Sequence, residues 1–225
     1  MATQVYKTLA KIVGIVLILA GIGAFAGGAY ADSFIASQLK DQQVVLPTTE
    51  SIDGQFKGGG LSQEDADALY PVAGQTVTTG DQARIFADHY IYAHMKSAVK
   101  RAGLEPGMTF ATVGEVVNEK KAELAKEIAQ DNPAADEAAV KKMVEAEVSN
   151  PLTKYETATA VAKLDSLRND TLLTGNTIRG MLLNAYGWGL VGKVAKFAGI
   201  GLFVVGLGLT AYGFLYKGRN TKAEA

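Results

Sequence analysis

The stretch that decides the fold is IVGIVLILAGIGAFAGGAYA, residues 12 to 31, which carries no charged side chain. A second uncharged run of twenty residues covers residues 197 to 216. At about 1.5 Å of rise per residue, a helix of this length spans the roughly 30 Å hydrocarbon core of a bilayer. A core helix of a small domain is seldom apolar over such a length. The two runs therefore predict two membrane-spanning helices.

The end of the first run has an alternative interpretation. Ala29-Tyr30-Ala31 followed by Asp32 has the small-x-small pattern of a signal-peptidase site. However, the apolar part of a cleaved signal is about 7–15 residues long, and the uncharged run from Ile12 is longer. We therefore expect the first helix to be retained, with cleavage after Ala31 as the alternative.

Glycines recur every seven residues in both runs: Gly14, Gly21 and Gly28 in the first, and Gly199, Gly206 and Gly213 in the second. Seven residues are two helical turns, so each set lies on one face, where another backbone can approach closely. Membrane helices are rich in glycine in general, which is the alternative explanation. If the two helices run antiparallel, Gly14 lies at the same depth in the membrane as Gly213, Gly21 at the depth of Gly206, and Gly28 at the depth of Gly199. We therefore expect the glycines to pack the helices into a hairpin.

Basic residues flank the outer ends of both runs: Lys7 and Lys11 on one side, and Lys217, Arg219 and Lys222 on the other. Short basic ends stay in the cytoplasm, so the chain is expected in the plasma membrane with both termini cytoplasmic. The fold class is then mostly α, with two antiparallel transmembrane helices flanking an exported, predominantly helical domain. The expected segments are a cytoplasmic N-terminus (1–11), the first transmembrane helix (12–31), the exported domain (32–186), an interfacial and transmembrane helix (187–216) and a cytoplasmic tail (217–225).

Helix-start and helix-stop signals divide the middle of the chain. The first helix is expected to continue to Leu39, and residues 47 to 61 to form a turn-rich loop. Further helices are expected from Ser62 to Pro71, at about 80–102 after a Thr79–Gln82 capping box, at 109–130 and at 134–149. A last helix is expected to begin with Pro151 at its first position and to kink at residues 174 to 176.

The composition limits the possible chemistry. A net charge of −1 argues against a nucleic-acid partner, and the absence of cysteine excludes a disulfide framework. The only histidines, His89 and His94, are five residues apart, about 140° around a helix, so one ion cannot readily bind both. No catalytic, cofactor-binding or metal-binding residues are therefore expected. A membrane-bound metalloenzyme using His89 with His94 or Asp88 is the alternative.

The most unusual stretch is RNDTLLTGNTIRGMLLNAYGWG, residues 168 to 189, which precedes the second apolar run. It predicts a docking surface for lipid headgroups or a partner subunit, formed by Arg168, Arg179, Asn184, Tyr186 and Trp188. The alternative is a joint beside the membrane, in which the two arginines snorkel or pair with acidic side chains of the domain.

Five stretches carry a resemblance to a known group: KIVGIVLILAG (11–21), SQLKDQQVVLP (37–47), TTGDQARIFADHYIYAHM (78–95), GMTFATVGEVV (107–117) and RGMLLNAYGWGLVG (179–192). The chain resembles small actinobacterial membrane proteins often called "aromatic ring-opening dioxygenase". The resemblance implies two membrane helices around an exported domain, without an established chemistry. Such dioxygenases hold iron through two histidines and a carboxylate, which the spacing of His89 and His94 does not suit. We set the enzymatic name aside.

The expected function is that of a non-catalytic integral membrane protein. It would act as an interaction or accessory subunit of a larger envelope or respiratory membrane complex, in contact with the lipid bilayer and a protein partner. An envelope protein that contacts lipid or glycan, through residues 47 to 61 and the two arginines, is a further alternative.

Overall fold

The structure, a computed structural model, describes residues 2 to 215, and these are mostly helical, as the sequence predicts. Within this range no strand longer than an isolated bridge residue is present. The chain forms two compact units. Unit 1 comprises the residues up to 44, residues 76 to 83 and those from 184 on, and unit 2 comprises residues 45 to 75 and 84 to 183.

Two helices are long and apolar enough to cross a membrane, as predicted. They are α1 (Ala2–Asp41) and α9 (Thr174–Leu215), the latter being the end of a continuous helical stretch from Glu156. Only 11% of the most apolar part of each is buried. A core helix of a soluble domain would be mostly buried, so these two helices present their apolar side chains outward.

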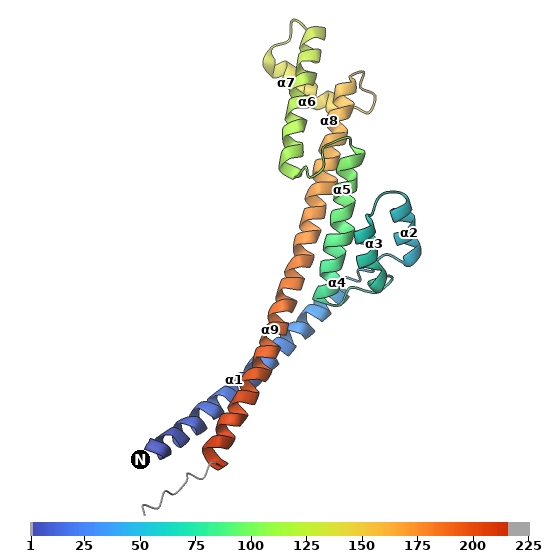
Figure 1. The fold of residues 1–225 in the computed structure, drawn as a ribbon. Coiled ribbons are helices and arrows are strands. Elements are labelled where there is room, and N and C mark those ends of the chain that lie inside the picture. The colour runs from blue at the N-terminus through green and yellow to red at the C-terminus, as the bar shows by residue number, and fades with distance from the viewer. Residues whose placement is uncertain (1, 216–225) are drawn as a thin grey trace, which may run out of the picture. The chain divides into compact units, whose positions relative to one another are not determined.

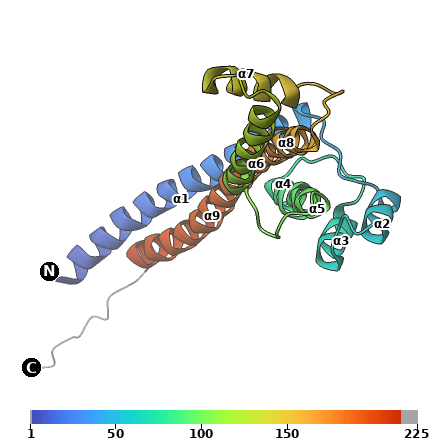
Figure 2. The ribbon, with the colours of Figure 1, turned by 90° about the horizontal axis from the view of Figure 1, so that it is seen from above.

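Unit 1 is built from these two helices. Residues 184 to 215 of α9 pack along α1, and we call these two segments the helix pair (Figures 1 and 2). The short segment 76–83, which contains the start of α4 (Gly80–Ile85), completes the unit. The backbone N–H of Val77 donates to the carbonyl of Val44, which ties this segment to the residues that follow α1.

Unit 2 holds the remaining elements. Their bounds are α2 (Thr49–Lys57), α3 (Gln63–Leu69), the 3-10 turn η1 (Tyr70–Val72), the π-helix η2 (Phe86–Ile91), α5 (Tyr92–Arg101), α6 (Phe110–Asp131), α7 (Glu137–Val148), α8 (Glu156–Ser166) and the π-helix η3 (Leu167–Leu173). Within this unit, α2 and α3 lie beside α5, and α7 lies across α6 and α8 (Figure 2). Its core includes two apolar clusters of described residues, one around Met95, Val113 and Val161 and one around Leu124 and Ile128.

The predicted helix starts are confirmed where a capping box is present. Thr79 and Gln82 exchange reciprocal hydrogen bonds at the start of α4, and Ser62 and Asp65 do so at the start of α3. Each box satisfies backbone N–H groups that the first helical turn leaves without partners. At the other end, Gly103 follows α5 with a positive φ of 73°, a conformation that glycine adopts without strain.

Residues 47 to 61 were predicted as a loop, and this is wrong, because Thr49–Lys57 form α2. The hydroxyl of Thr48 accepts a hydrogen bond from the N–H of Ser51 and caps the helix, and Ile52 is completely buried. Gly54 weakens a helix without preventing it, so burial of one apolar side chain and a good cap outweigh the turn signals.

The last helix also begins and bends differently from the prediction. Pro151 lies in a turn, where Asn150 Oδ1 accepts from the N–H of Leu152, and α8 begins only at Glu156. Residues 174 to 176, where a kink is expected, form the first turn of α9, and Gly175 lies against Met95. The irregularity lies just before it, in the π-helical segment η3.

Candidate functional site

The predicted helix-packing glycines lie where α1 and α9 meet, within unit 1. A Cβ atom added to Gly21 would lie 2.6 Å from the carbonyl oxygen of Gly199, which is closer than real Cβ atoms come to backbone. We call the row of glycines spaced seven residues apart on each helix the stripe. The same crowding recurs along it, in the pairs Gly14 with Gly206, Gly21 with Gly199 and Gly28 with Gly192. At these pairs no side chain fits between the backbones.

The register of these pairs differs from the expected one by one repeat of the stripe. The sequence predicts Gly21 opposite Gly206, but Gly21 meets Gly199, and Gly213 meets Lys7 and Lys11 instead of Gly14. Because the stripe repeats every seven residues, glycines can face glycines in either register. The observed one also brings Gly192 into the stripe.

Other glycines of the helix pair face away from the contact. Cβ atoms added to Gly23, Gly27, Gly201 or Gly208 would meet no atom of the described chain within 4 Å. Each helix thus uses one glycine face for the contact and leaves other glycines open.

The glycine contact ends at two ion pairs. Lys196 Nζ binds Asp32 Oδ2, and Lys193 Nζ binds Asp81 Oδ2. The first pair joins α9 to α1, and the second joins α9 to the start of α4. The side chains of Asp81 and Lys193 are 53% and 46% exposed, so this second pair is reachable from outside.

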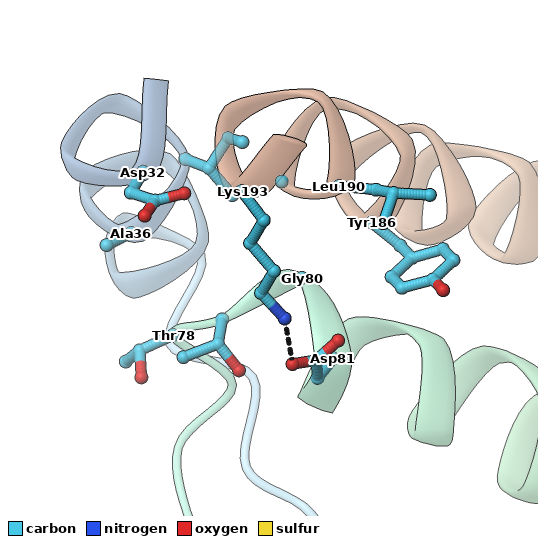
Figure 3. A pocket seen from close by; sticks show the side chains of 11 residues that line it. Asp32, Ala36, Thr78, Gly80, Asp81, Tyr186, Leu190 and Lys193 are labelled. Atoms are coloured by element: carbon cyan, nitrogen blue, oxygen red, sulfur yellow. Dashed lines mark hydrogen bonds and ion pairs between the residues drawn. The ribbon is translucent and has the colours of Figure 1, made fainter. Parts of the chain in front are cut away.

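A pocket of about 270 Å³ lies at this charged end, between α1, α9 and the start of α4 (Figure 3). In Figure 3, Lys193 extends from α9 across the pocket to Asp81, and the ring of Tyr186 lies beside it. The lining combines charged, hydroxyl and apolar groups, from Asp32, Ile35, Ala36, Thr78, Thr79, Gly80, Asp81, Tyr186, Gly189, Leu190 and Lys193. We call it the unit 1 pocket.

Close backbone approach shapes the pocket as well. A Cβ atom on Gly80 would lie 3.0 Å from Tyr186 Cα, so only glycine lets the start of α4 come this near to α9. The capping box between Thr79 and Gln82 fixes the backbone on either side of Gly80. The position of Asp81 opposite Lys193 follows from this local geometry.

The two arginines of the predicted docking surface are used inside unit 2. Arg168 lies over the ring of Phe110, 4.0 Å from its centroid, and its Nε donates to the Phe110 carbonyl over 3.2 Å. Arg179 donates to Asp88 Oδ1 over 2.8 Å and lies over the ring of Tyr92. The contact of Arg179 with Asp88 agrees with the alternative interpretation of this stretch, in which the arginines pair with acidic side chains of the domain.

The other three residues of that surface lie in unit 1, on α9. Asn184 is exposed, Trp188 is 60% exposed, and Tyr186 is half-buried and lines the unit 1 pocket. A docking role for any of the five residues remains a prediction.

Both histidines make contacts within unit 2. His89 Nδ1 lies 3.1 Å from Asp65 Oδ1, and His94 Nδ1 lies 2.8 Å from the carbonyl oxygen of Tyr90. Asp88, the third candidate ligand, pairs with Arg179. Among residues 2 to 215, no group of three or more histidine, aspartate or glutamate side chains is placed to hold a metal ion.

Asp65 is a buried charged residue, with 5% of its surface exposed. Burial is the largest single influence and raises the pKa of its carboxyl group, but hydrogen bonds from Ser62 and His89 and the charge of Lys96 together outweigh it. The net result is a pKa below the ordinary value of 3.8. Asp65 is therefore held as a carboxylate that joins α3 to η2.

Sequence reasoning missed several residues that hold α1, α9 and the start of α4 together. Gly192 could have been found, because it lies seven residues before Gly199 and extends the stripe. Asp32 and Lys196 could have been paired, because Asp32 directly follows the first apolar run and Lys196 directly precedes the second. Nothing in the sequence indicates the pairing of Asp81 with Lys193, 112 residues apart.

In comparisons with known proteins, no family model, curated protein or solved structure matches the chain. The resemblance to the small actinobacterial membrane proteins thus remains a prediction.

Proposed function

We propose that this chain is a two-pass plasma-membrane protein whose antiparallel helix hairpin carries an exported helical domain. Both termini lie in the cytoplasm, and residues 32 to 186 lie outside it. The chain serves as a non-catalytic accessory subunit of a larger envelope or respiratory membrane complex. The observation that carries the proposal is the helix pair, whose backbones touch along glycine while its outer side chains are apolar and exposed.

Insertion in a bilayer is supported by what the helix pair leaves uncovered. Leu19 is 64% exposed and Phe197 is 75% exposed, and similar side chains follow along both helices. Water would penalise such a surface by about 25 cal/mol per Å² of apolar area, whereas lipid does not. In lipid, helix association depends on close packing, for which glycine contacts are suited.

The orientation is supported by the charges at the ends of the helices. Lys7 and Lys11 precede the first apolar run, and the basic residues Lys217, Arg219 and Lys222 follow the second, outside the described residues. Lys193 and Lys196, at the opposite ends, are paired with aspartates. These two lysines flank the long segment between the runs, and long segments cross a membrane largely regardless of their charge, so the short basic ends carry more weight.

An accessory role is supported by how the domain uses its reactive side chains. In unit 2, His89 with Asp65 and Arg179 with Asp88 each hold one helix to another, and His94 contacts the Tyr90 carbonyl within its own helical stretch. These contacts serve the stability of the bundle. We therefore assign the chain to recognition and assembly rather than to a reaction.

Topology is testable because the chain has no cysteine. Gln4→Cys and Leu152→Cys place single thiols at two exposed positions, one near the N-terminus and one in the domain, where Leu152 is 90% exposed. A membrane-impermeant maleimide added to intact cells should label the Leu152 variant alone. Labelling of the Gln4 variant in intact cells, or release of the protein by alkaline carbonate, contradicts the proposal.

The accessory role is tested by cross-linking from inside the native membrane. A photo-reactive amino acid at Trp188, which is 60% exposed, should give one discrete product heavier than the chain. The same group at Leu152 is the matched exposed control. A chain that gives no product from either position, and migrates alone in mild detergent, is not a subunit of a complex.

A further inference from the structure

We propose that the unit 1 pocket binds the headgroup of an ethanolamine phospholipid from the outer leaflet. This inference rests on the proposed insertion of the helix pair in the membrane. It assigns a ligand to the pocket, which nothing in the proposed function requires.

The pocket lies at the depth of lipid headgroups if the apolar runs span the bilayer. Asp32 follows the last residue of the first run, and Lys196 directly precedes the second run. Asp32 and Lys193 both line the pocket. The lining residues therefore begin where the hydrocarbon core ends, which is where phosphate and amine groups of lipids lie.

The charges of the pocket are of both signs. Asp81 and Lys193 face each other across it (Figure 3). Asp32 contributes a second carboxylate, one oxygen of which binds Lys196. An ammonium of Lys193 has three N–H donors, of which the Asp81 contact uses one, so donors remain for a phosphate. A carboxylate has about four acceptor positions, so Asp81 and Asp32 can accept from a ligand ammonium as well. A zwitterionic headgroup with phosphate and ammonium groups matches this arrangement.

The remaining walls of the pocket are apolar. Ile35, Ala36 and Leu190 line the pocket together with the ring of Tyr186. Along each helix these residues lie further from the apolar run than Asp32 and Lys193, so they can contact the two methylenes of the ethanolamine group. At about 270 Å³, the pocket holds a headgroup and not a whole lipid, whose chains would remain in the bilayer.

Chemistry separates ethanolamine from the other common headgroups. A choline headgroup carries no N–H, so it cannot donate to Asp32 or Asp81. A phosphatidylglycerol headgroup has no cation, so it offers Asp32 and Asp81 no charged donor. Both should therefore bind more weakly than ethanolamine.

The test uses the full-length protein, purified in mild detergent and mixed in turn with phosphatidylethanolamine, phosphatidylcholine and phosphatidylglycerol of the same acyl chains. Native mass spectrometry counts the lipids that stay bound. We expect phosphatidylethanolamine to be retained about tenfold better than either of the other two, the scale of one charge-assisted hydrogen bond.

Variants locate the retained lipid. Asp81→Asn and Lys193→Met each remove one charge of the pocket and should abolish the preference for ethanolamine. Asp131→Asn and Lys154→Met break an ion pair of the same kind in unit 2 and should leave it unchanged. Ala36→Leu keeps every charge but fills the pocket, so it should also lower lipid retention. This variant leaves the ion pairs intact, so its effect cannot come from helices that separate when an ion pair is lost.

Equal retention of the three lipids, stronger retention of phosphatidylglycerol, or a preference that survives both Asp81→Asn and Ala36→Leu would overturn the inference. The maleimide labelling described above reports separately on the proposed function. A correctly inserted protein without a preference for ethanolamine disproves only the lipid site, whereas a protein that never enters the membrane disproves both.

Discussion

Gly21 of α1 and Gly199 of α9 approach so closely that each backbone occupies the space of the other's missing side chain. A Cβ on either residue would lie 2.6 Å from the carbonyl oxygen of its partner. Such reciprocity means that neither helix can accept a larger residue by moving a flexible side chain, because the obstacle is backbone. The contact therefore makes the helix pair sensitive to the smallest substitution.

Gly21→Ala should destabilise the helix pair by about 1–3 kcal/mol, the scale of overpacking in a tight core. Gly23→Ala, two residues along the same helix, is the matched control, because its Cβ would meet nothing within 4 Å. This control should be neutral or slightly stabilising, since alanine is the better helix former. The free energy of unfolding in detergent distinguishes the two, and equal effects would mean that the glycine contact does not form.

The register of the helix pair can be fixed by disulfides in this cysteine-free chain. A Cβ on Gly192 would lie 3.4 Å from Ala31 Cβ, close to the separation of about 3.8 Å in disulfides. Ala31→Cys with Gly192→Cys should therefore cross-link on mild oxidation. Failure of this pair to cross-link in the inserted protein would contradict the observed register.

The apolar runs and the cap signals were enough to predict the main helices. An uncharged run of twenty residues has few structural alternatives, and a capping box acts through residues close in the sequence. The register of the stripe was not predictable, because a seven-residue repeat satisfies two registers equally well. The observed register is accompanied by the pairing of Asp32 with Lys196, which the sequence allows, and of Asp81 with Lys193, which is visible only in the folded chain.

The π-helical segments were missed for a related reason. In η2 and η3 the helix widens by local hydrogen bonding, while the residues remain ordinary helix formers. The α2 helix was missed because Asp53-Gly54 and Gly58-Gly59-Gly60 are strong turn signals. Burial of Ile52 against the rest of unit 2 outweighs them, and burial is not a local property.

Asp65→Asn should destabilise unit 2 at neutral pH and have little effect in acid. The pKa of Asp65 lies below its ordinary value of 3.8, so the folded state favours the carboxylate. Its contribution is complete above the ordinary pKa and is lost as the pH falls through the lowered one. We expect the free energy of unfolding of the wild type to exceed that of the variant by about 1–3 kcal/mol at pH 7 and pH 5. This is the cost of an impaired buried hydrogen-bond network.

Thermal unfolding followed by circular dichroism at pH 7, 5 and 3 measures this difference. Asp67→Asn is the control, because Asp67 is exposed on the same helix and accepts only from Gln63. A wild-type advantage that grows on acidification would contradict the assigned direction of the pKa.

Arg179→Lys should cost about 1–2 kcal/mol although it preserves the charge. The guanidinium binds Asp88 and lies over the ring of Tyr92 at 4.8 Å from its centroid, and a lysine ammonium cannot make both contacts in this geometry. Arg101→Lys, at an exposed position where the side chain contacts Ser97, should be neutral. Equal stability of the two variants in chemical denaturation would show that Arg179 is free to act at a surface.

Gly175→Ala should be tolerated, in contrast to Gly21→Ala, although the two sites look equally crowded. A Cβ on Gly175 would lie 2.6 Å from Met95 Sδ, which is the flexible end of a side chain. Methionine has several rotatable bonds and can move aside, while alanine favours the helix by about 0.5–1 kcal/mol over glycine. The net change in the free energy of unfolding should be less than about 1 kcal/mol.

The same site supplies its own control in a double-mutant cycle. Met95→Ile replaces the flexible neighbour with a stiff, branched one, so Gly175→Ala should become costly in that background. We expect a coupling energy of at least about 1 kcal/mol between the two substitutions, which is within the range for residues in contact. Additive effects would mean that Met95 does not accommodate the added methyl group, and that Gly175 is present in α9 for another reason.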